Sequence, residues 1–309
     1  MSIQTMTKIV GLNIADRQGA GLFRAARGLL GLLVAFTGLY LLLTQALPAV
    51  WAAVEHIMTT PAKLRAVELS AIAGAATGLG GMALLVMRKI DDQGLGLFIA
   101  IAAGMMAAAA VISLFLPALQ TEGALAVALV ASAAGYGLMT MVDQTLPHEH
   151  PVAGPAQQAG AERLRMAMLM TIAIGLHNLP EGFAVGASAG AGAAANNGAA
   201  LSIGLQNIPE GLIVATALWS IGVSKGMAAL AALLTGLVEP VGAAVGVVAS
   251  DAWPMGTPAA MAFAAGAMAF VVFNEMIPES VKMTGKIKTL YTAGVSTVLT
   301  ALALGWMGA

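Results

Sequence analysis

LHNLPEG at residues 176–182 and LQNIPEG at residues 205–211 are two copies of one polar motif within otherwise apolar sequence. Each copy carries a carboxylate, an amide and a proline, and the flanking residues are Ala, Gly, Leu, Ile and Met. An ionisable side chain inside a membrane helix costs several kcal/mol, so it marks a functional site by default. The repetition therefore predicts one polar site built from two helices.

The surrounding composition indicates an integral membrane protein. Of the 309 residues, 59% are hydrophobic and 9% are charged, whereas soluble domains carry about 25% charged residues. Abundant Gly and Ala with few aromatic residues favour closely packed helices over a membrane barrel. We therefore expect an all-α, polytopic transmembrane helical bundle in the cell (inner) membrane, with the lipid bilayer around it.

Composition also argues against several functions. The chain has no Cys, which excludes disulfides and thiolate metal sites. A net charge of −1 does not favour nucleic-acid binding, and without a GxxxxGK[ST] motif nucleotide-driven pumping is disfavoured. The amino terminus lacks the pattern of a removable signal peptide, so the first helix is expected to stay.

About 20 apolar residues cross a bilayer, and the chain contains nine such stretches. They are expected at residues 28–47, 66–87, 95–119, 123–142, 166–190, 199–221, 226–249, 258–278 and 289–307. Twelve of the 14 Lys and Arg residues then fall on one side, which places the amino terminus in the cytoplasm and the carboxyl terminus in the periplasm or outside. Residues 1–27 are expected to form a cytoplasmic amphipathic segment and residues 143–165 a polar cytoplasmic loop.

Three of these spans carry polar residues near their centres. The residues are His177, Asn178, Glu181, Gln206, Asn207, Glu210 and Glu239. Residues four positions apart share one helical face, so His177 stacks on Glu181 and Gln206 on Glu210. The proline of each motif frees a carbonyl near the same patch. Helices broken by proline at the midplane are typical of transporters.

This set of side chains suits a divalent metal ion. Oxygen donors with a single imidazole fit zinc, iron, manganese or cadmium. Three carboxylates at one depth repel one another unless they are protonated or bridged by cations, and their spans hold no Lys or Arg. Met105 and Met106 lie at the same depth; packing is the default interpretation and a thioether ligand the alternative. For any single polar residue, interhelical hydrogen bonding is an equal alternative.

An inverted repeat is also predicted. The two motifs lie on adjacent spans, which run in opposite directions. IAAGMMAAAAVISLFLP at 101–117 and FAAGAMAFVVFNEMIP at 263–278 are alike as well, and their spans also run oppositely. Secondary transporters are often built in this way, with the substrate site at the interface of the repeats.

A second polar group lies toward the cytoplasm. It consists of Asn274, Glu275 and Glu279 at the end of the eighth span and His148, Glu149 and His150 in the loop. Glu275, His148 and His150 form a candidate exit path for a metal ion. The alternative, favoured for the loop, is ordinary solvated side chains.

Taken together, the motifs resemble the ZIP (zinc/iron-regulated transporter-like) family of divalent metal transporters, in its bacterial branch. The likeness rests on HNLPEG, QNIPEG, Glu239-Pro240, AAGMM at 102–106 and NEMIPE at 274–279. It implies an eight-helix transport domain at residues 66–307, preceded by an extra transmembrane helix at 28–47. It further implies import of divalent ions, zinc first and also cadmium, iron or manganese, by a homodimer without a prosthetic group.

The resemblance also implies a binuclear site at the bilayer midplane. The primary metal site would comprise Met106, His177, Glu181, Gln206 and Glu210. The second would comprise Asn178, Glu181, Asn207, Glu210 and Glu239, with Glu181 and Glu210 bridging the ions. Asn207 stands where similar sequences tend to have Asp, which weakens the second site. Asn274 stands where relatives often have His, which weakens the exit-path role of Glu275.

Two other functions stay open. An intramembrane metal-dependent hydrolase or protease would use a metal-activated water. HNLPEG is not HExxH, because an amide follows the His and leaves no general base at that spacing, so we expect no enzyme. A channel for divalent cations differs from a carrier only in rate and saturation, which sequence does not separate.

Overall fold

The computed structural model describes residues 37, 42–87, 91–145 and 160–307. The chain divides into two units, Met1–His56 and Ile57–Ala309. Residues 1–27, most of the predicted span at 28–47, and His148, Glu149 and His150 lie outside the described residues. Predictions about them therefore stay predictions.

In the first unit, the described residues form the π-helix η1 (Leu42–Ala46) and the start of α2 (Leu47–Thr59). Helix α2 thus continues past residue 47, where the first predicted span ends. Pro48 follows η1 by two residues, and the wider π-helical turn accommodates the backbone donor that proline lacks. No Gly or Pro follows before Thr60, so nothing stops the helix earlier.

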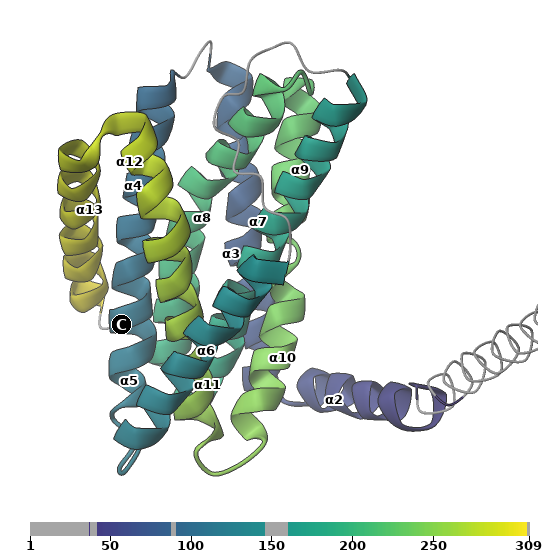
Figure 1. Ribbon diagram of the computed structural model, residues 1–309. Helices are drawn as coiled ribbons and strands as arrows, with labels where there is room; N and C mark the ends of the chain where they lie inside the picture. The colour runs from purple at the N-terminus through teal and green to yellow at the C-terminus, as the bar shows by residue number, and fades with distance from the viewer. Residues whose placement is uncertain (1–36, 38–41, 88–90, 146–159, 308–309) are drawn as a thin grey trace, which may run out of the picture. The chain divides into compact units, whose positions relative to one another are not determined.

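The second unit is a bundle of long helices (Figure 1). Its elements are α3 (Pro61–Val86), α4 (Asp92–Ala108), η2 (Ala109–Phe115), α5 (Leu116–Ala118), α6 (Leu125–Thr145), α7 (Gly160–Ser188), η3 (Ala189–Ala191), α8 (Ala193–Ser220), α9 (Lys225–Gly236), α10 (Glu239–Asp251), α11 (Gly256–Phe270), η4 (Val271–Met276), α12 (Ile277–Thr284) and α13 (Lys286–Met307). The described residues contain no strand. The predicted all-helical class is confirmed.

Seven rods of this bundle are long and apolar enough to cross a membrane, counting only described residues. Three of them join several elements: α4 continues through η2 and α5, α9 leads into α10, and α11 continues through η4 and α12. Helix α7 is an eighth long rod and packs against α8, α10 and α11. The membrane class is thus confirmed, whereas the count of nine spans is not.

Two helices continue past their predicted ends. Helix α6 runs to Thr145 and α7 begins at Gly160, so the helices take both ends of the loop predicted at 143–165. Residues 160–165 read GAERLR, and Ala, Glu, Leu and Arg are strong helix formers. A helix can continue beyond the apolar stretch wherever such residues follow it.

Two π-helical segments occur at matching places. Segment η2 ends two residues before Pro117, and η4 ends two residues before Pro278. A proline cannot donate a backbone hydrogen bond, and a wider turn accommodates the missing donor. The predicted similarity of residues 101–117 and 263–278 thus extends to a shared irregularity of the backbone.

The prolines of the polar motifs behave differently. Helices α7 and α8 are continuous through Pro180 and Pro209, so the predicted helix breaks at the two motifs are wrong. Neighbouring helices hold both rods closely on either side, and a membrane helix tolerates proline under those conditions. A break does occur in the seventh span, where Leu237 and Val238 separate α9 from α10.

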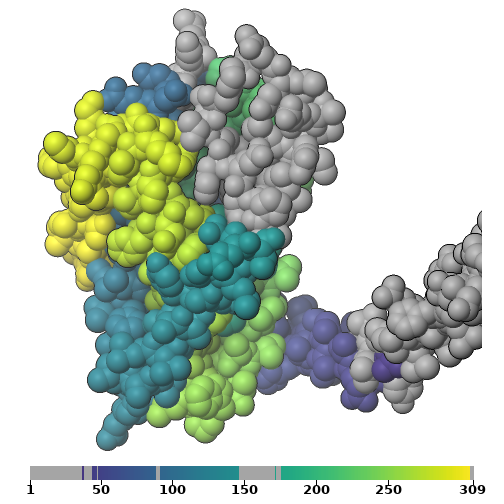
Figure 2. All heavy atoms as spheres, viewed as in Figure 1, coloured from purple at the N-terminus to yellow at the C-terminus, as the bar shows by residue number. Residues whose placement is uncertain are grey.

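Interior and exterior helices differ in burial. Helices α8 and α11 are largely buried, whereas α6 and α13 expose most of their surface. Figure 2 shows α12 and α13, in yellow, on the outside of the bundle above the blue-green region of α5 and α6. The buried apolar residues are predominantly Ala, which allows close helix approach. The motif-bearing α8 therefore lies in the interior.

Each polar motif ends in Pro-Glu-Gly, at residues 180–182 and 209–211, called the PEG motifs below. The glycine of each PEG motif contacts the backbone of a different neighbouring helix. A Cβ built on Gly182 would lie 2.0 Å from the carbonyl oxygen of Glu239 on α10. A Cβ built on Gly211 would lie 1.8 Å from the carbonyl oxygen of Thr77 on α3. Only glycine allows such contacts. Helix α10 therefore covers α7 as α3 covers α8.

Helices α3 and α9 cross at another pair of glycines. A Cβ on Gly74 would lie 2.1 Å from the carbonyl oxygen of Gly236, and a Cβ on Gly236 would lie 2.0 Å from that of Gly74. These two glycines are 162 positions apart in the chain, and so are Thr77 and Glu239. Residues related by a two-fold axis touch their own counterparts only at that axis. The Gly74–Gly236 contact therefore marks the axis of the inverted repeat.

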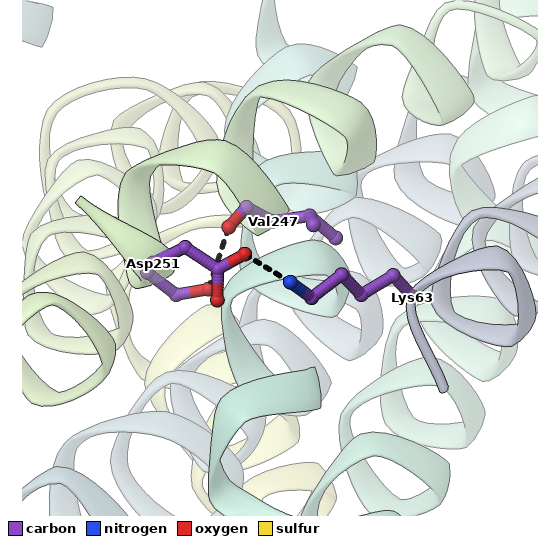
Figure 3. Close-up of polar contacts among 4 residues, drawn as sticks. Lys63, Val247 and Asp251 are labelled. Carbon is purple, nitrogen blue, oxygen red and sulfur yellow. Dashed lines mark hydrogen bonds and ion pairs between the residues drawn. The ribbon is translucent and has the colours of Figure 1, made fainter. Parts of the chain in front are cut away.

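Two lysines are also related by the offset of 162 residues, and each makes a contact between helix ends. Lys63 near the start of α3 forms an ion pair with Asp251 at the end of α10, as Figure 3 shows. Lys225 at the start of α9 donates to the carbonyl oxygen of Met87, directly after α3. Lys63 and Lys225 are again 162 positions apart. Each lysine thus joins the beginning of one helix to the end of its counterpart.

Candidate polar site inside the bundle

The polar residues predicted at one depth lie inside the bundle. Fully buried side chains among them belong to Asn178, Glu181, Gln206, Asn207 and Glu239. His177 and Glu210 are partly buried. They come from α7, α8 and the first residue of α10. The structure thus brings polar groups from three helices into an apolar interior.

Two amides hold two of the carboxylates. The Gln206 Nε2 atom donates to Glu181 Oε1 at 2.8 Å, which joins α8 to α7. The Asn207 Nδ2 atom donates to Glu239 Oε1 at 2.6 Å, which joins α8 to α10. An ionised carboxylate only accepts, so each amide must turn its nitrogen toward its partner. Adjacent residues of α8 therefore position one glutamate on each side.

The same arrangement leaves oxygen atoms without a donor. In the described part of the chain, five buried oxygens of the site have no hydrogen-bond partner: Glu181 Oε2, Gln206 Oε1, Asn207 Oδ1, Glu210 Oε1 and Glu239 Oε2. Buried polar atoms without partners are rare and costly. Carboxylate and amide oxygens are suitable ligands for divalent cations. The donor set therefore fits a metal ion as substrate.

His177 contacts a residue from another part of the chain. Its Nε2 atom lies 3.0 Å from Glu275 Oε2, and the side chains are 17% and 8% exposed. Glu275 belongs to η4, and its side chain reaches His177 on α7. This glutamate is therefore buried against the first motif and is not a solvated helix-end residue. Whether it lies near His148 or His150 falls outside the described residues.

Asn274 and Glu279, which flank Glu275, face elsewhere. The Asn274 Nδ2 atom donates to the hydroxyl of Tyr136 at 2.5 Å and to the carbonyl oxygen of Phe270 at 3.3 Å. Glu279 Oε2 pairs with Lys282 at 3.1 Å. Among the contacts of these three side chains with described residues, the one with a motif residue is that of Glu275.

The predicted metal centre is not assembled as a compact cluster. Within the residues that the structure describes, no three His, Asp or Glu side chains lie close enough together to hold one ion. Glu181 and Glu239 are each held by one amide, in separate pairs. Met106 is buried in the large apolar cluster that also contains Ala73 and Val185. Ligand roles for these residues, and the binuclear arrangement, therefore stay predictions.

Helix α3 contributes to the site although its sequence carries no polar motif. The carbonyl oxygen of Ala73 accepts from Asn207 Nδ2 at 2.8 Å. A Cβ on Gly74 would lie 3.2 Å from Glu239 Oε1. The run AGAATGLGG at 73–81 is the only local signal, because its small residues indicate a helix that others approach closely.

The three glutamates are not paired with cations in the part of the chain that the structure describes. In the described parts of the chain, none of Glu181, Glu210 and Glu239 forms an ion pair with Lys or Arg. Close carboxylates repel unless a proton or a cation intervenes. Together the fold and this site define a polytopic α-helical membrane protein with an interior polar site between inverted repeats.

The chain belongs to the ZIP family. The family model described as "ZIP Zinc transporter" matches residues 143–302. The chain is 40% identical over 220 residues to the zinc transporter GufA of Myxococcus xanthus, covering 68% of this chain and 86% of that protein. It is 39% identical over 224 residues to the zinc transporter ZIPB of Bordetella bronchiseptica, covering 67% and 69%. It is also 32% identical to the zinc transporter ZupT of Salmonella newport, covering 68% and 84%. The predicted family is thus confirmed.

Proposed function

We propose that this protein carries divalent transition metal ions, zinc first and also cadmium, iron or manganese, across the inner membrane into the cytoplasm. Its membership of the ZIP family and the names of its relatives support metal transport. The observation that carries the proposal is the set of five partnerless oxygens buried between α7, α8 and α10. Oxygen donors without protons to share suit a cation, and the low dielectric of the interior strengthens its attraction.

The two amide–carboxylate pairs suggest how the substrate is held. Each amide donates through nitrogen to one carboxylate oxygen and keeps its own oxygen free. Each pair can therefore offer one carboxylate oxygen and one amide oxygen to an ion. Glu210 offers a further buried carboxylate oxygen without a partner among the described residues. We propose that Glu181 and Glu210 are shared by two ions, with His177 and Met106 completing the primary site and Asn178 the second.

Glu275 extends this site. Because His177 already contacts Glu275, an ion leaving His177 would meet a carboxylate next. This supports the exit-path role for Glu275. The second metal site is the weaker one, because Asn207 brings no charge. Its Nδ2 atom donates to Glu239 and to the Ala73 carbonyl, so only its oxygen is free to bind an ion. A homodimer and cytoplasmic import are carried over from the family resemblance.

Transport by purified protein tests the proposal. We expect proteoliposomes to take up zinc down its gradient without ATP, with saturable kinetics, and Glu181→Ala or His177→Ala to reduce uptake to that of empty liposomes. Glu122→Gln is a matched control, because Glu122 is an exposed glutamate between α5 and α6. Normal uptake by both site variants would disprove the site. Uptake that never saturates would indicate a channel.

A further inference from the structure

Thr77 on α3 is the counterpart of Glu239 in the other half of the molecule. Besides the PEG glycines, a second pair of contacts shows this register. A Cβ on Gly242 would lie 2.3 Å from the carbonyl oxygen of Leu179, and a Cβ on Gly80 would lie 1.8 Å from that of Ile208. Gly80 and Gly242 are 162 positions apart, and the residues that they meet, Leu179 and Ile208, are 29 positions apart. The contacts of the motif glycines have the same two offsets: Thr77 and Glu239 are 162 positions apart, and Gly182 and Gly211 are 29 positions apart. The register therefore holds over a full helical turn.

The side chains of Thr77 and Glu239 also occupy corresponding positions. A Cβ on Gly236 would lie 2.6 Å from Thr77 Oγ1, and a Cβ on Gly74 would lie 3.2 Å from Glu239 Oε1. Each polar group thus lies beside the axial glycine of the opposite helix. The two-fold axis therefore relates the position of the Thr77 hydroxyl to the position of the Glu239 carboxylate.

The hydroxyl of Thr77 has no hydrogen-bond partner among the described residues, and the side chain is 1% exposed. Several other buried hydroxyls bond to their own helix: Thr235 Oγ1, for example, donates to the carbonyl of Ala232 at 2.7 Å. Among the described residues, Ser70 and Thr216 share the lack of a partner with Thr77. The acceptor at the same spacing for Thr77 is the Gly74 carbonyl, which faces Gly236 at the axis. The carbonyl four residues before Thr77, that of Ala73, already accepts from Asn207.

The neighbouring amide shows the same lack of a partner. Asn178 is the counterpart of Asn207 by the 29-residue repeat. Asn207 Nδ2 donates to Glu239, whereas Asn178 Nδ2 has no partner among the described residues. One half of the repeat therefore holds a bonded amide and carboxylate. The other half holds an amide and a hydroxyl, both buried with unsatisfied atoms.

From this geometry we propose that Thr77 is a further residue of the transport site, whose hydroxyl oxygen helps to determine which metal ion is accepted. The inference rests on the proposed function. A hydroxyl adds a neutral, hard oxygen donor without adding a fourth negative charge to Glu181, Glu210 and Glu239. Hard oxygen donors favour zinc and manganese over the softer cadmium ion.

Three variants test the role of the hydroxyl. Thr77→Val keeps the shape and removes the oxygen, and Thr77→Ser keeps the oxygen. Thr216→Val is the matched control, because Thr216 on α8 is also buried with a partnerless hydroxyl but has no place in the repeat contacts. In proteoliposomes given zinc and cadmium together, we expect Thr77→Val to lower the zinc-to-cadmium uptake ratio about fivefold, the effect of losing roughly 1 kcal/mol from a single weak ligand. Thr77→Ser and Thr216→Val should keep the ratio.

A second readout measures binding without transport. Purified protein in detergent is titrated against a zinc-chelating dye and, separately, a cadmium-responsive dye; Thr77→Val should weaken zinc binding more than cadmium binding. Unchanged ratios in Thr77→Val, an equal change in Thr216→Val, or a Ser variant that behaves like the Val variant would overturn the inference. Should the Val variant fail to fold, Thr77→Ala removes the same oxygen. If the unmodified protein takes up no zinc, the proposed function fails first.

Discussion

At the scale of single residues, the contact between His177 and Glu275 joins the first motif to a segment almost one hundred positions later. Both residue types were recognisable in the sequence as candidates. Their proximity was not, since it depends on how segments distant in the chain come together in the bundle. This buried histidine–carboxylate contact is the observation on which the proposed exit-path role of Glu275 rests.

We expect Glu275→Gln to slow zinc uptake about tenfold, because a charge-assisted contact with His177 is worth about 1.5–3 kcal/mol. Initial rates in proteoliposomes and zinc affinity in detergent measure the change. Affinity should change much less than rate, since Glu275 lies outside the amide–carboxylate pairs. Glu279→Gln is the matched control, because Glu279 is also buried but pairs with Lys282. Equal impairment in both variants would contradict an exit role.

At the scale of helices, close helix packing explains why each polar motif has a glycine directly after its glutamate. The glutamate supplies the polar group, and the glycine directly after it lets a neighbouring helix approach within backbone contact. In α7 the neighbour is α10, and the residue met by Gly182 is Glu239 itself. The motif thus carries one carboxylate and brings a second one close.

We expect Gly182→Ala to destabilise the protein by about 1–3 kcal/mol, because its Cβ would lie 2.0 Å from the Glu239 carbonyl and force α7 from α10. A lower Tm in detergent and reduced zinc affinity measure the effect. Gly175→Ala on the same helix is the control, because nothing lies within 4 Å of a Cβ there. That variant should be neutral or slightly stabilising. A Gly182→Ala protein as stable as Gly175→Ala would disprove the close docking.

At the scale of the whole molecule, the two contact offsets of 162 and 29 residues describe one inverted repeat. Helices α3 and α9–α10 are counterparts, as are α7 and α8. The lysines at their ends obey the relation as well. Such a fold offers equivalent structures at its two membrane faces, which suits a carrier that opens to each side in turn.

The absence of native cysteine permits a direct test of orientation. We expect Glu122→Cys to react with an impermeant maleimide from outside intact cells and Lys286→Cys to react only after the membrane is opened. Both positions are exposed in the structure, and the distribution of Lys and Arg places them on opposite sides. The unmodified chain should not react. Labelling of both variants from the same side would refute the predicted topology.

The sequence by itself determined the membrane class, the helical fold, the family and the polar motifs. It could do so because crossing a lipid bilayer requires long apolar segments whose hydrogen bonds close within each helix, so the information is local. It misjudged the helix breaks at Pro180 and Pro209, where packing by neighbours overrides local preference. Only the tertiary structure decided that Glu275 meets His177, that Gly74 meets Gly236 and that Thr77 stands opposite Glu239. Those contacts join residues distant in the chain, and they depend on how closely small side chains let whole helices approach.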